Sequence, residues 1–349
     1  MKLAGQALWA KAQESDTSLA VHSNEWATLA RKRIRAVPYS RERVFSSMAK
    51  GRVSLVTRLP VPVQTRSKDL SRLLADRLRH GFLSHVEANV RLGPSRRRAS
   101  LRVPEVVRRW EEGRSRMCVT DLHFRGTRFE KSVDTKALSH FNLYSLSQHL
   151  ISELEMMTLV ISTQGALTDS HSDDSDGTNH CFVGRKLWLV WDRLEGQRAG
   201  LQDVEYDAII DKAAFDIQTF LGLLSSRWFL VEPGMTLFLP GDLTHKVITL
   251  DRYLGLGSFY FSLPCAVRTM QRWILRDPGE STKAQIDRVV RVSLRQVGAL
   301  RRGAPRTRES WGLKHFESAA RGSRTHWSTL ANELKADDRF VRLIQAGSS

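Results

Sequence analysis

The pattern of hydrophobic and polar residues changes its period along the chain. Between residues 117 and 264 the apolar residues come in short continuous or alternating runs, which Gly and Pro separate. Such runs predict β-strands joined by turns. The runs are 117–133, interpreted as a hairpin, 156–163, 181–191 on both sides of Gly184, 228–242, and a closing pair in 245–263. With one helical segment expected at 206–224, this pattern predicts a mainly β core, a barrel or jelly roll rather than a doubly wound sheet.

Helical spacing dominates before this core. Residues 1–36 have apolar residues at loosely helical spacing, and 68–90 has the pattern of an amphipathic helix. A further helix is expected from near Pro104 to Trp110. Between these, 52–63 is expected to be a short extended segment.

Domain limits follow from the same pattern. The arginine-rich stretch 91–103 is expected to be a loop and a boundary. After Pro264, helices are expected at 265–276, 282–301 and 326–345, which either pack on the core or form a homodimer interface. We therefore divide the chain into a basic, mostly helical N-terminal region, the β core and a basic helical C-terminal region, with the limits 1–116, 117–264 and 265–349.

Composition narrows the class of protein. The chain is 41% hydrophobic, enough to bury a core, and no apolar run is long enough to span a bilayer. The apolar stretch near the N-terminus is too short for a signal peptide, so we expect a cytoplasmic protein, or a nuclear one in a eukaryote. Cys118, Cys181 and Cys265 are widely spaced and odd in number, which favours free thiols. Without a Gly-rich phosphate loop before a helix, a nucleotide-binding enzyme is disfavoured.

The net charge of +17 is unevenly distributed. Residues 1–150 carry +16 and residues 265–349 carry +9, whereas 151–264 carries −8. The basic flanks are either solvated helix faces or a surface for nucleic acid or another polyanion. The acidic middle can instead accept a basic protein segment, and because the candidate site lies there, the charge slightly favours a protein substrate.

One cluster of residues has the composition of a metal site. His171 and Asp173 stand two apart after an apolar run, so both side chains lie on the same side of a strand. A third ligand is available at His245, after a strand and a turn. Two histidines and one carboxylate form the facial triad that suits non-haem Fe(II) and leaves three coordination positions open. Those positions are enough for a chelating keto acid and O2.

Charge balance extends this hypothesis to a co-substrate. Fe(II) with one carboxylate and two neutral imidazoles keeps a net positive charge, which attracts an anionic keto acid. The distal carboxylate of 2-oxoglutarate then needs a cation, for which Lys186 on a neighbouring strand is the candidate. Thr168 can donate a second hydrogen bond.

Several simpler interpretations compete with this one. His-x-Asp pairs are common, and His180 is a rival ligand at a less suitable spacing. The acidic cluster after His171 does not fit a calcium loop, because Val183 stands where an EF-hand needs Glu. Cys181 is expected to be a small buried residue rather than a ligand. The aromatic residues near the site either wall a pocket or belong to the core: Trp188, Trp191, Phe238 and Phe261.

Two blocks of sequence resemble the jumonji-C oxygenases. Residues 168–191 (TDSHSD…GRKLWLVW) are similar to that family's Thr-x-x-His-x-Asp…Gly-x-Lys-x-Trp pattern. Residues 233–250 (PGMTLFLPGDLTHKVITL) are similar to its strand, turn and distal histidine. The resemblance covers about 156–264 and implies a cupin-like double-stranded β-helix. It also implies that His171, Asp173 and His245 bind iron and that Thr168 and Lys186 bind 2-oxoglutarate.

The resemblance implies an Fe(II)- and 2-oxoglutarate-dependent dioxygenase that hydroxylates a macromolecule, or demethylates it through hydroxylation. A protein side chain is the favoured substrate, and a nucleic acid such as tRNA is the alternative. Gly177 stands where many members have Asn, with Asn179 the nearest candidate, and Phe259 stands where demethylase-like members have Asn, so the polar wall around the keto acid differs from the usual one. Two further alternatives remain, a cupin isomerase and a non-catalytic cupin-like binding module.

Overall fold

The computed structural model describes residues 3–59, 61, 70–93, 97–124, 129–134, 138, 157–173, 175–201, 215–241, 243–276 and 280–321. This part of the chain is a mixture of helices and strands. The strands are β1 (Val37–Pro38), β2 (Ser54–Thr57), β3 (Glu87–Leu92), β4 (Arg97–Arg102), β5 (Met117–His123), β6 (Met157–Ser162), β7 (Leu167–Ser172), β8 (Asp176–Val183), β9 (Lys186–Asp192), β10 (Arg227–Val231), β11 (Met235–Leu239), β12 (Leu243–Thr249) and β13 (Tyr253–Tyr260).

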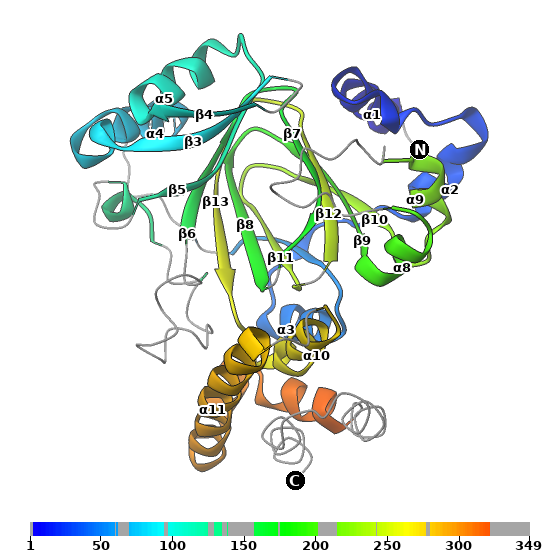
Figure 1. Cartoon of the computed structure of the whole chain (residues 1–349), viewed down its shortest axis with the longest axis vertical. Coiled ribbons are helices and arrows are strands. Elements are labelled where there is room, and N and C mark those ends of the chain that lie inside the picture. The colour runs from blue at the N-terminus through cyan, green and yellow to red at the C-terminus, as the bar shows by residue number, and fades with distance from the viewer. Residues whose placement is uncertain are drawn as a thin grey trace.

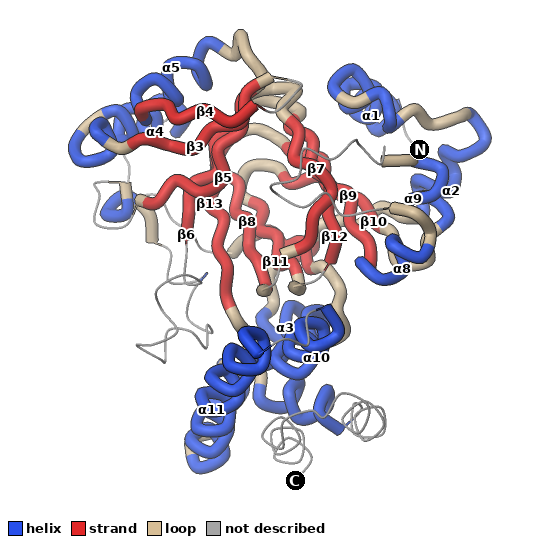
Figure 2. The backbone as a smooth tube through the Cα atoms, in the orientation of Figure 1, coloured by secondary structure: helices blue, strands red, loops and turns tan. Residues whose placement is uncertain are grey.

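The described strands form two sheets. The large sheet has nine strands in the order β1-β2-β11-β8-β13-β6-β5-β3-β4, and the small sheet has four in the order β10-β9-β12-β7. From β6 to β13 the chain passes back and forth between the sheets, with β9 and β10 as the one consecutive pair in the same sheet. The sheets lie face to face (Figure 2), and their inner faces share a core that includes Val160, Trp188, Leu237 and Val247.

The continuous apolar run of β9 shows why its strand is buried on both faces. Trp188 and Val190 point into the core between the sheets, while Leu187, Leu189 and Trp191 pack on the helices outside the small sheet. The turn before β9 requires a glycine. Gly184 has φ +81°, and a Cβ there would lie 2.0 Å from the carbonyl oxygen of Arg252.

Helices cover the outer faces and one end of the sheets (Figure 1). Helices α3, α4 and α5 pack on the outside of the large sheet, and α1, α2 and α9 on the outside of the small sheet. Helices α10 and α11 form a separate apolar cluster below the sheets in this view. The helices are α1 (Leu3–Ser15), α2 (Trp26–Arg31), α3 (Arg41–Ala49), α4 (Leu70–Arg79), α5 (Val103–Glu112), α8 (Arg193–Arg198), α9 (Ile217–Gly222), α10 (Ala266–Arg276), α11 (Glu280–Arg302) and α12 (Pro305–Ser310), with short 3-10 helices at Thr17–Leu19, Ser23–Glu25, Gly81–His85, Glu130–Ser132 and Leu263–Cys265.

Most of the strands and helices expected from the pattern are present. The strands at 156–163, 181–191, 228–242 and 245–263 are confirmed as β6 and β8 to β13. The helices expected near Pro104, at 265–276 and at 282–301 are confirmed as α5, α10 and α11. The helix expected at 326–345 lies outside the described residues, as do residues 206–214 of the one expected at 206–224, whose described part contains α9.

The arginine-rich stretch 91–103 is not the expected loop. It contributes to the hairpin of β3 and β4, in which Val90 pairs with Ala99. The helix expected over 68–90 accordingly stops at Arg79, and β3 begins at Glu87. The loop prediction was wrong because β4 is an edge strand, whose exposed side carries charged residues without loss of its hydrogen bonds.

The hairpin expected at 117–133 was also wrong. Its first half is β5, but β5 pairs with β3 and β6, and the second half contains a 3-10 helix at Glu130–Ser132. The aromatic residues of this segment pack together, with Phe124 and Phe129 edge to face at 5.2 Å. The large sheet joins strands from both sides of the proposed boundary at 116/117, and the domain limits stay predictions.

No helix in the described parts of the chain is both long and apolar enough to cross a membrane.

The N-terminal segment is fastened to the small sheet by buried contacts. Trp9 packs edge to face on Trp228 of β10, with ring centroids 5.3 Å apart. The buried ammonium group of Lys246 in β12 lies 2.8 Å from the carboxylate of Asp16. Helix α1 and the turn after it therefore cover the outer face of the strand that carries His245.

A buried carboxylate joins three turns at one end of the sheets. Asp176, at the start of β8, accepts hydrogen bonds from the backbone N–H of Gly241 and from the N–H and hydroxyl of Ser262, at 3.0, 3.2 and 2.9 Å. A Cβ at Gly241 would lie 3.0 Å from the backbone of Ser175, so glycine allows this approach. Burial raises the pKa of the Asp176 carboxyl, while these hydrogen bonds act in the opposite direction. Asp176 thus holds the turn that leads into β12.

We expect Asp176→Ala to lower the free energy of unfolding by about 3 kcal/mol, because it leaves three buried donors without their acceptor. Urea denaturation measures this change. The matched control is Asp216→Ala, which removes an exposed N-cap of α9 and should cost about 1 kcal/mol. Equal effects of the two substitutions would show that Asp176 is not a structural anchor.

Candidate metal centre

The structure brings the three predicted metal ligands together. His171 lies in β7, Asp173 follows that strand directly, and His245 lies in β12. Strands β7 and β12 are antiparallel neighbours, and His245 pairs with His171. Residues directly opposite each other project to the same face of a sheet, so the imidazole rings lie side by side, with centroids 4.2 Å apart.

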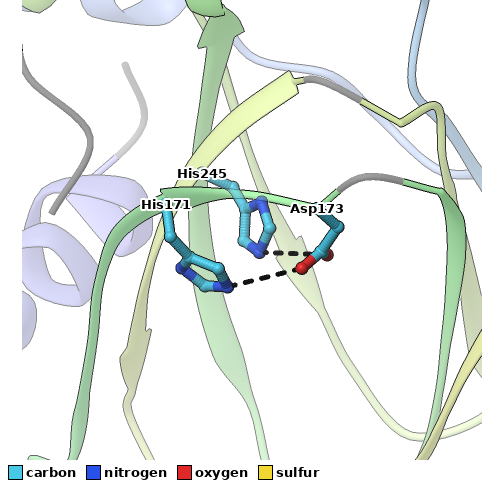
Figure 3. Close-up of side chains that lie close together, drawn as sticks. All are labelled: His171, Asp173 and His245. Atoms are coloured by element: carbon cyan, nitrogen blue, oxygen red, sulfur yellow. Dashed lines mark ion pairs between the residues drawn. The ribbon is translucent and has the colours of Figure 1, made fainter. Parts of the chain in front are cut away.

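The ligand atoms of these side chains converge (Figure 3). The Nε2 atoms of His171 and His245 each lie 3.8 Å from a carboxylate oxygen of Asp173. One ligand atom from each of the three residues can be chosen so that all lie within 4.8 Å of one another. Two atoms bonded to one ion at about 2.1 Å each lie at most about 4.2 Å apart, so small side-chain movements bring all three within reach of one metal.

Backbone carbonyls orient both histidine rings. The Nδ1 of His171 lies 2.7 Å from the carbonyl oxygen of Asp169, and the Nδ1 of His245 lies 3.2 Å from that of Leu243. A carbonyl only accepts hydrogen bonds, so each Nδ1 must carry the proton and donate it. In a neutral ring the lone pair is then on Nε2, the atom that points at Asp173, which is the tautomer that a metal site needs.

The surroundings of Asp173 affect the charge of its carboxyl group. Burial raises the pKa of the Asp173 carboxyl, and the nearby His171 acts in the opposite direction. A divalent cation held by these three side chains would favour the ionised form and offset the cost of burying it. This set of donors is therefore better satisfied with a metal ion bound than without one.

The cluster lies in a pocket between the two sheets. Its lining includes the two predicted co-substrate residues, Thr168 and Lys186, and also the candidate amide Asn179. Gly177 and Phe259, the two departures from the family pattern, line the same pocket. Trp188 forms part of the wall and stacks on His245 at 5.2 Å with an interplanar angle of 26°.

Lys186 is a buried cation in this pocket. Its side chain is 2% exposed, and its ammonium group lies 4.6 Å from the ring centroid of Tyr253. No carboxylate of the described residues forms an ion pair with it. The neighbouring thiol of Cys181 is neutral at physiological pH, because burial raises its pKa to about 12. Burial also lowers the pKa of Lys186, as expected for an ammonium group without an anion beside it.

Tyr253 is a residue of the site that the sequence analysis missed. Its hydroxyl donates a hydrogen bond to the side-chain oxygen of Asn179, and its ring faces Lys186. Tyr253 begins β13 and belongs to neither of the two matched sequence blocks. No motif indicates it, because strand pairing alone brings it beside β8.

His180, the rival ligand, lies elsewhere. It follows Asn179 in β8, so its side chain projects to the opposite face of the large sheet. There it forms a 2.8 Å hydrogen bond with the hydroxyl of Thr236 and contacts the edge of Phe182. Burial lowers its pKa to about 4, so it is a neutral core histidine.

Of the four aromatic candidates, Trp188 lines the pocket and the other three are found in the apolar cores, namely Trp191, Phe238 and Phe261. Cys181 is fully buried and lies within hydrogen-bonding distance of the carbonyl of Gly184, away from the ligand cluster.

Comparison of the chain with models of known protein families and with curated protein sequences gives no match. The function is therefore inferred from the geometry of the site.

Because His180 is buried and neutral, we expect it to make stability depend on pH. In the unfolded chain its pKa is about 6.5, so as the pH falls the unfolded state takes up the proton first. The contribution of His180 is complete above pH 6.5 and is lost progressively toward pH 4, by about 3 kcal/mol in total. His180→Gln lacks this proton uptake, so the stability difference between wild type and variant should shrink over that range. Urea denaturation at several pH values measures it, and a difference that stays constant would contradict the assignment.

Proposed function

We propose that this protein is an Fe(II)- and 2-oxoglutarate-dependent oxygenase of the jumonji-C type. One observation carries the proposal: a single pocket holds both a His-Asp-His cluster and a buried lysine without a carboxylate partner among the described residues. The first suits a metal ion, and the second suits the carboxylate of an anionic co-substrate.

The arrangement of strands supports a double-stranded β-helix at the centre. Strands β11-β8-β13-β6 of the large sheet lie opposite β10-β9-β12-β7 of the small sheet, and the chain alternates between them. In such a double sheet the residues at the ends of β7 and β12 reach the same interior space. That is the position of His171, Asp173 and His245.

The donor set favours iron among the divalent metals. Two imidazoles and one carboxylate on one face leave adjacent positions for a bidentate keto acid and for O2. When bound, iron with 2-oxoglutarate and O2 supplies the oxidative chemistry, in which the keto acid is decarboxylated to succinate and a substrate C–H bond is hydroxylated.

The side chains of this chain bind and orient the reactants. Lys186 would pair with the distal carboxylate of the keto acid, and Thr168 would donate a second hydrogen bond to it. A buried ammonium group gains most from such a partner, since water does not solvate it. The apolar side chains of Trp188, Leu237, Leu239 and Val247 keep this part of the pocket dry.

The acidity of residues 151–264 does not by itself indicate a basic substrate. Asp192 pairs with Arg272 at 2.7 Å, Asp251 pairs with Lys11 and Arg185, and Asp176 bonds the turns. Glu195 accepts hydrogen bonds from the backbone of Leu224 and Ser225. These acids stabilise the fold, so the choice between a protein and a nucleic-acid substrate depends on the surface around the pocket.

The first test is an anaerobic titration with Fe(II) followed by 2-oxoglutarate. We expect the weak visible charge-transfer band of a chelated keto acid in the wild type, and its loss in His171→Ala and His245→Ala because the metal is no longer held. The matched control is His85→Ala, which removes an exposed histidine and should leave the band unchanged. Iron binding without a band would favour a cupin-like isomerase, and no iron binding would favour a binding module.

The second test concerns Lys186. Lys186→Met should weaken the binding of 2-oxoglutarate by roughly 10- to 150-fold, because it removes a charge-assisted hydrogen bond that contributes about 1.5–3 kcal/mol. Iron binding should persist. The protein should remain at least as stable, because an unpaired buried charge is removed. Lys11→Met is the control: it removes a lysine that pairs with Asp251 outside the pocket, and it should lower stability slightly without changing the affinity for 2-oxoglutarate. An unaltered 2-oxoglutarate affinity in Lys186→Met would refute the role assigned to this residue.

A further inference from the structure

The large sheet extends past the small one. The small sheet ends at β7, whereas the large sheet continues beyond β6 through β5, β3 and β4. These three strands turn away from the small sheet, with α4 and α5 behind them (Figures 1 and 2). Ala88 and Val90 of β3 pack on the apolar side chains of α5. The opposite face of β3 and β4 continues the inner wall of the pocket.

Strand register identifies the residues on this inner face. Arg98 of β4 pairs with Arg91 of β3, and Arg91 pairs with Cys118 of β5. Side chains paired in this way project to one face, and alternate residues share it. The inner face therefore also carries Glu87, Asn89, Ser100 and Arg102, all of them exposed. We call Arg91, Arg98 and Arg102, with Asn89 and Ser100, the arginine platform.

The platform is continuous with the pocket. The sulfur of Cys118 lies 4.0 Å from the hydroxyl oxygen of Thr168, which lines the pocket. Neighbouring strands are about 4.8 Å apart, so Arg91 stands about 5 Å from Cys118 across the sheet, and Arg98 about 10 Å. Thr120 of β5, two residues after Cys118, is itself part of the pocket wall.

The charge of the arginine platform favours an anionic partner. Glu87, the one acid on this face of β3 and β4, accepts a hydrogen bond from Ser100 and lies opposite Arg102, so these two strands contribute three guanidinium groups and one carboxylate to the face. Guanidinium groups bind phosphate oxygens through paired hydrogen bonds, and Asn and Ser side chains add neutral donors. A basic protein segment would be repelled here.

We propose that the arginine platform binds the phosphodiester backbone of a single-stranded nucleic acid and leads one nucleotide into the pocket. The reaction of that nucleotide in the pocket rests on the proposed oxygenase function. The binding of the strand to the platform does not. A nucleic acid carries a charge on every nucleotide, so all three arginines meet phosphates whatever the sequence, whereas a protein segment offers this only where it is acidic. A single strand fits better than a duplex, because a base must leave its stack to enter an enclosed site. The platform has no aromatic side chain, which predicts binding without sequence preference.

The test is fluorescence anisotropy of labelled single strands, one RNA and one DNA of the same mixed sequence, with the full chain free of metal. We expect binding that weakens with salt. The triple substitution of Arg91, Arg98 and Arg102 by Gln should weaken it at least tenfold and reduce the slope of log K against log salt by about 2, since each phosphate contact on a single strand contributes roughly 0.7. The control triple substitution of Arg288, Arg291 and Arg295 by Gln removes the same charge from exposed positions of α11. It should change the affinity less than threefold.

Binding of either the RNA or the DNA strand with these responses supports the proposal, and comparing the two affinities shows which nucleic acid is preferred. Equal losses in the two triple variants, or binding of polyglutamate but of neither strand, would overturn it. Stimulation of 2-oxoglutarate turnover by a basic peptide and by neither strand would overturn it as well. Failure of the oxygenase proposal is distinguishable: the keto-acid band would be absent while the platform still binds the strands.

Discussion

The antiparallel register of β7 with β12 is the constraint on which the site depends. It places His245 opposite His171, and a shift by one residue would turn His245 to the outer face of the small sheet. Two contacts hold β12 in place, one in the turn before the strand and one on its outer face. Asp176 bonds to Gly241 inside the sheets, and Asp16 holds Lys246 from outside. Two carboxylates that bind no ligand thus determine where the imidazole of His245 points.

Two charged groups of the pocket lack a partner of full opposite charge among the described residues. Asp173 is half-buried beside two rings whose Nδ1 protons point away from it, and Lys186 is buried with an aromatic face as its neighbour. Each arrangement is unfavourable by itself, and each becomes favourable when a group of opposite charge is bound. Both groups line one pocket, as the proposed dicarboxylate co-substrate would need.

The sequence was informative where side-chain chemistry and strand period coincide. The runs around His171, Lys186 and His245 predicted both the strands and the residues that face the pocket, because a buried strand has a clear apolar pattern. It was uninformative where neighbours come from distant segments. Tyr253 gave no signal because its role follows from the pairing of β13 with β8. The stretch 91–103 was misread as a loop because an edge strand can be mostly polar on its exposed side.

The close packing of the N-terminal segment on the small sheet has a consequence for how the chain can be divided. A fragment that began at the first strand of the β core would lose Trp9, Leu19 and Leu29, which cover Leu187, Leu189 and Ile248. It would also lose Asp16 and so leave the ammonium group of Lys246 without its 2.8 Å partner. Limited proteolysis near the N-terminus would then destabilise the small sheet without touching any residue that lines the pocket. The N-terminal segment thus forms part of the packing that supports the strand carrying His245.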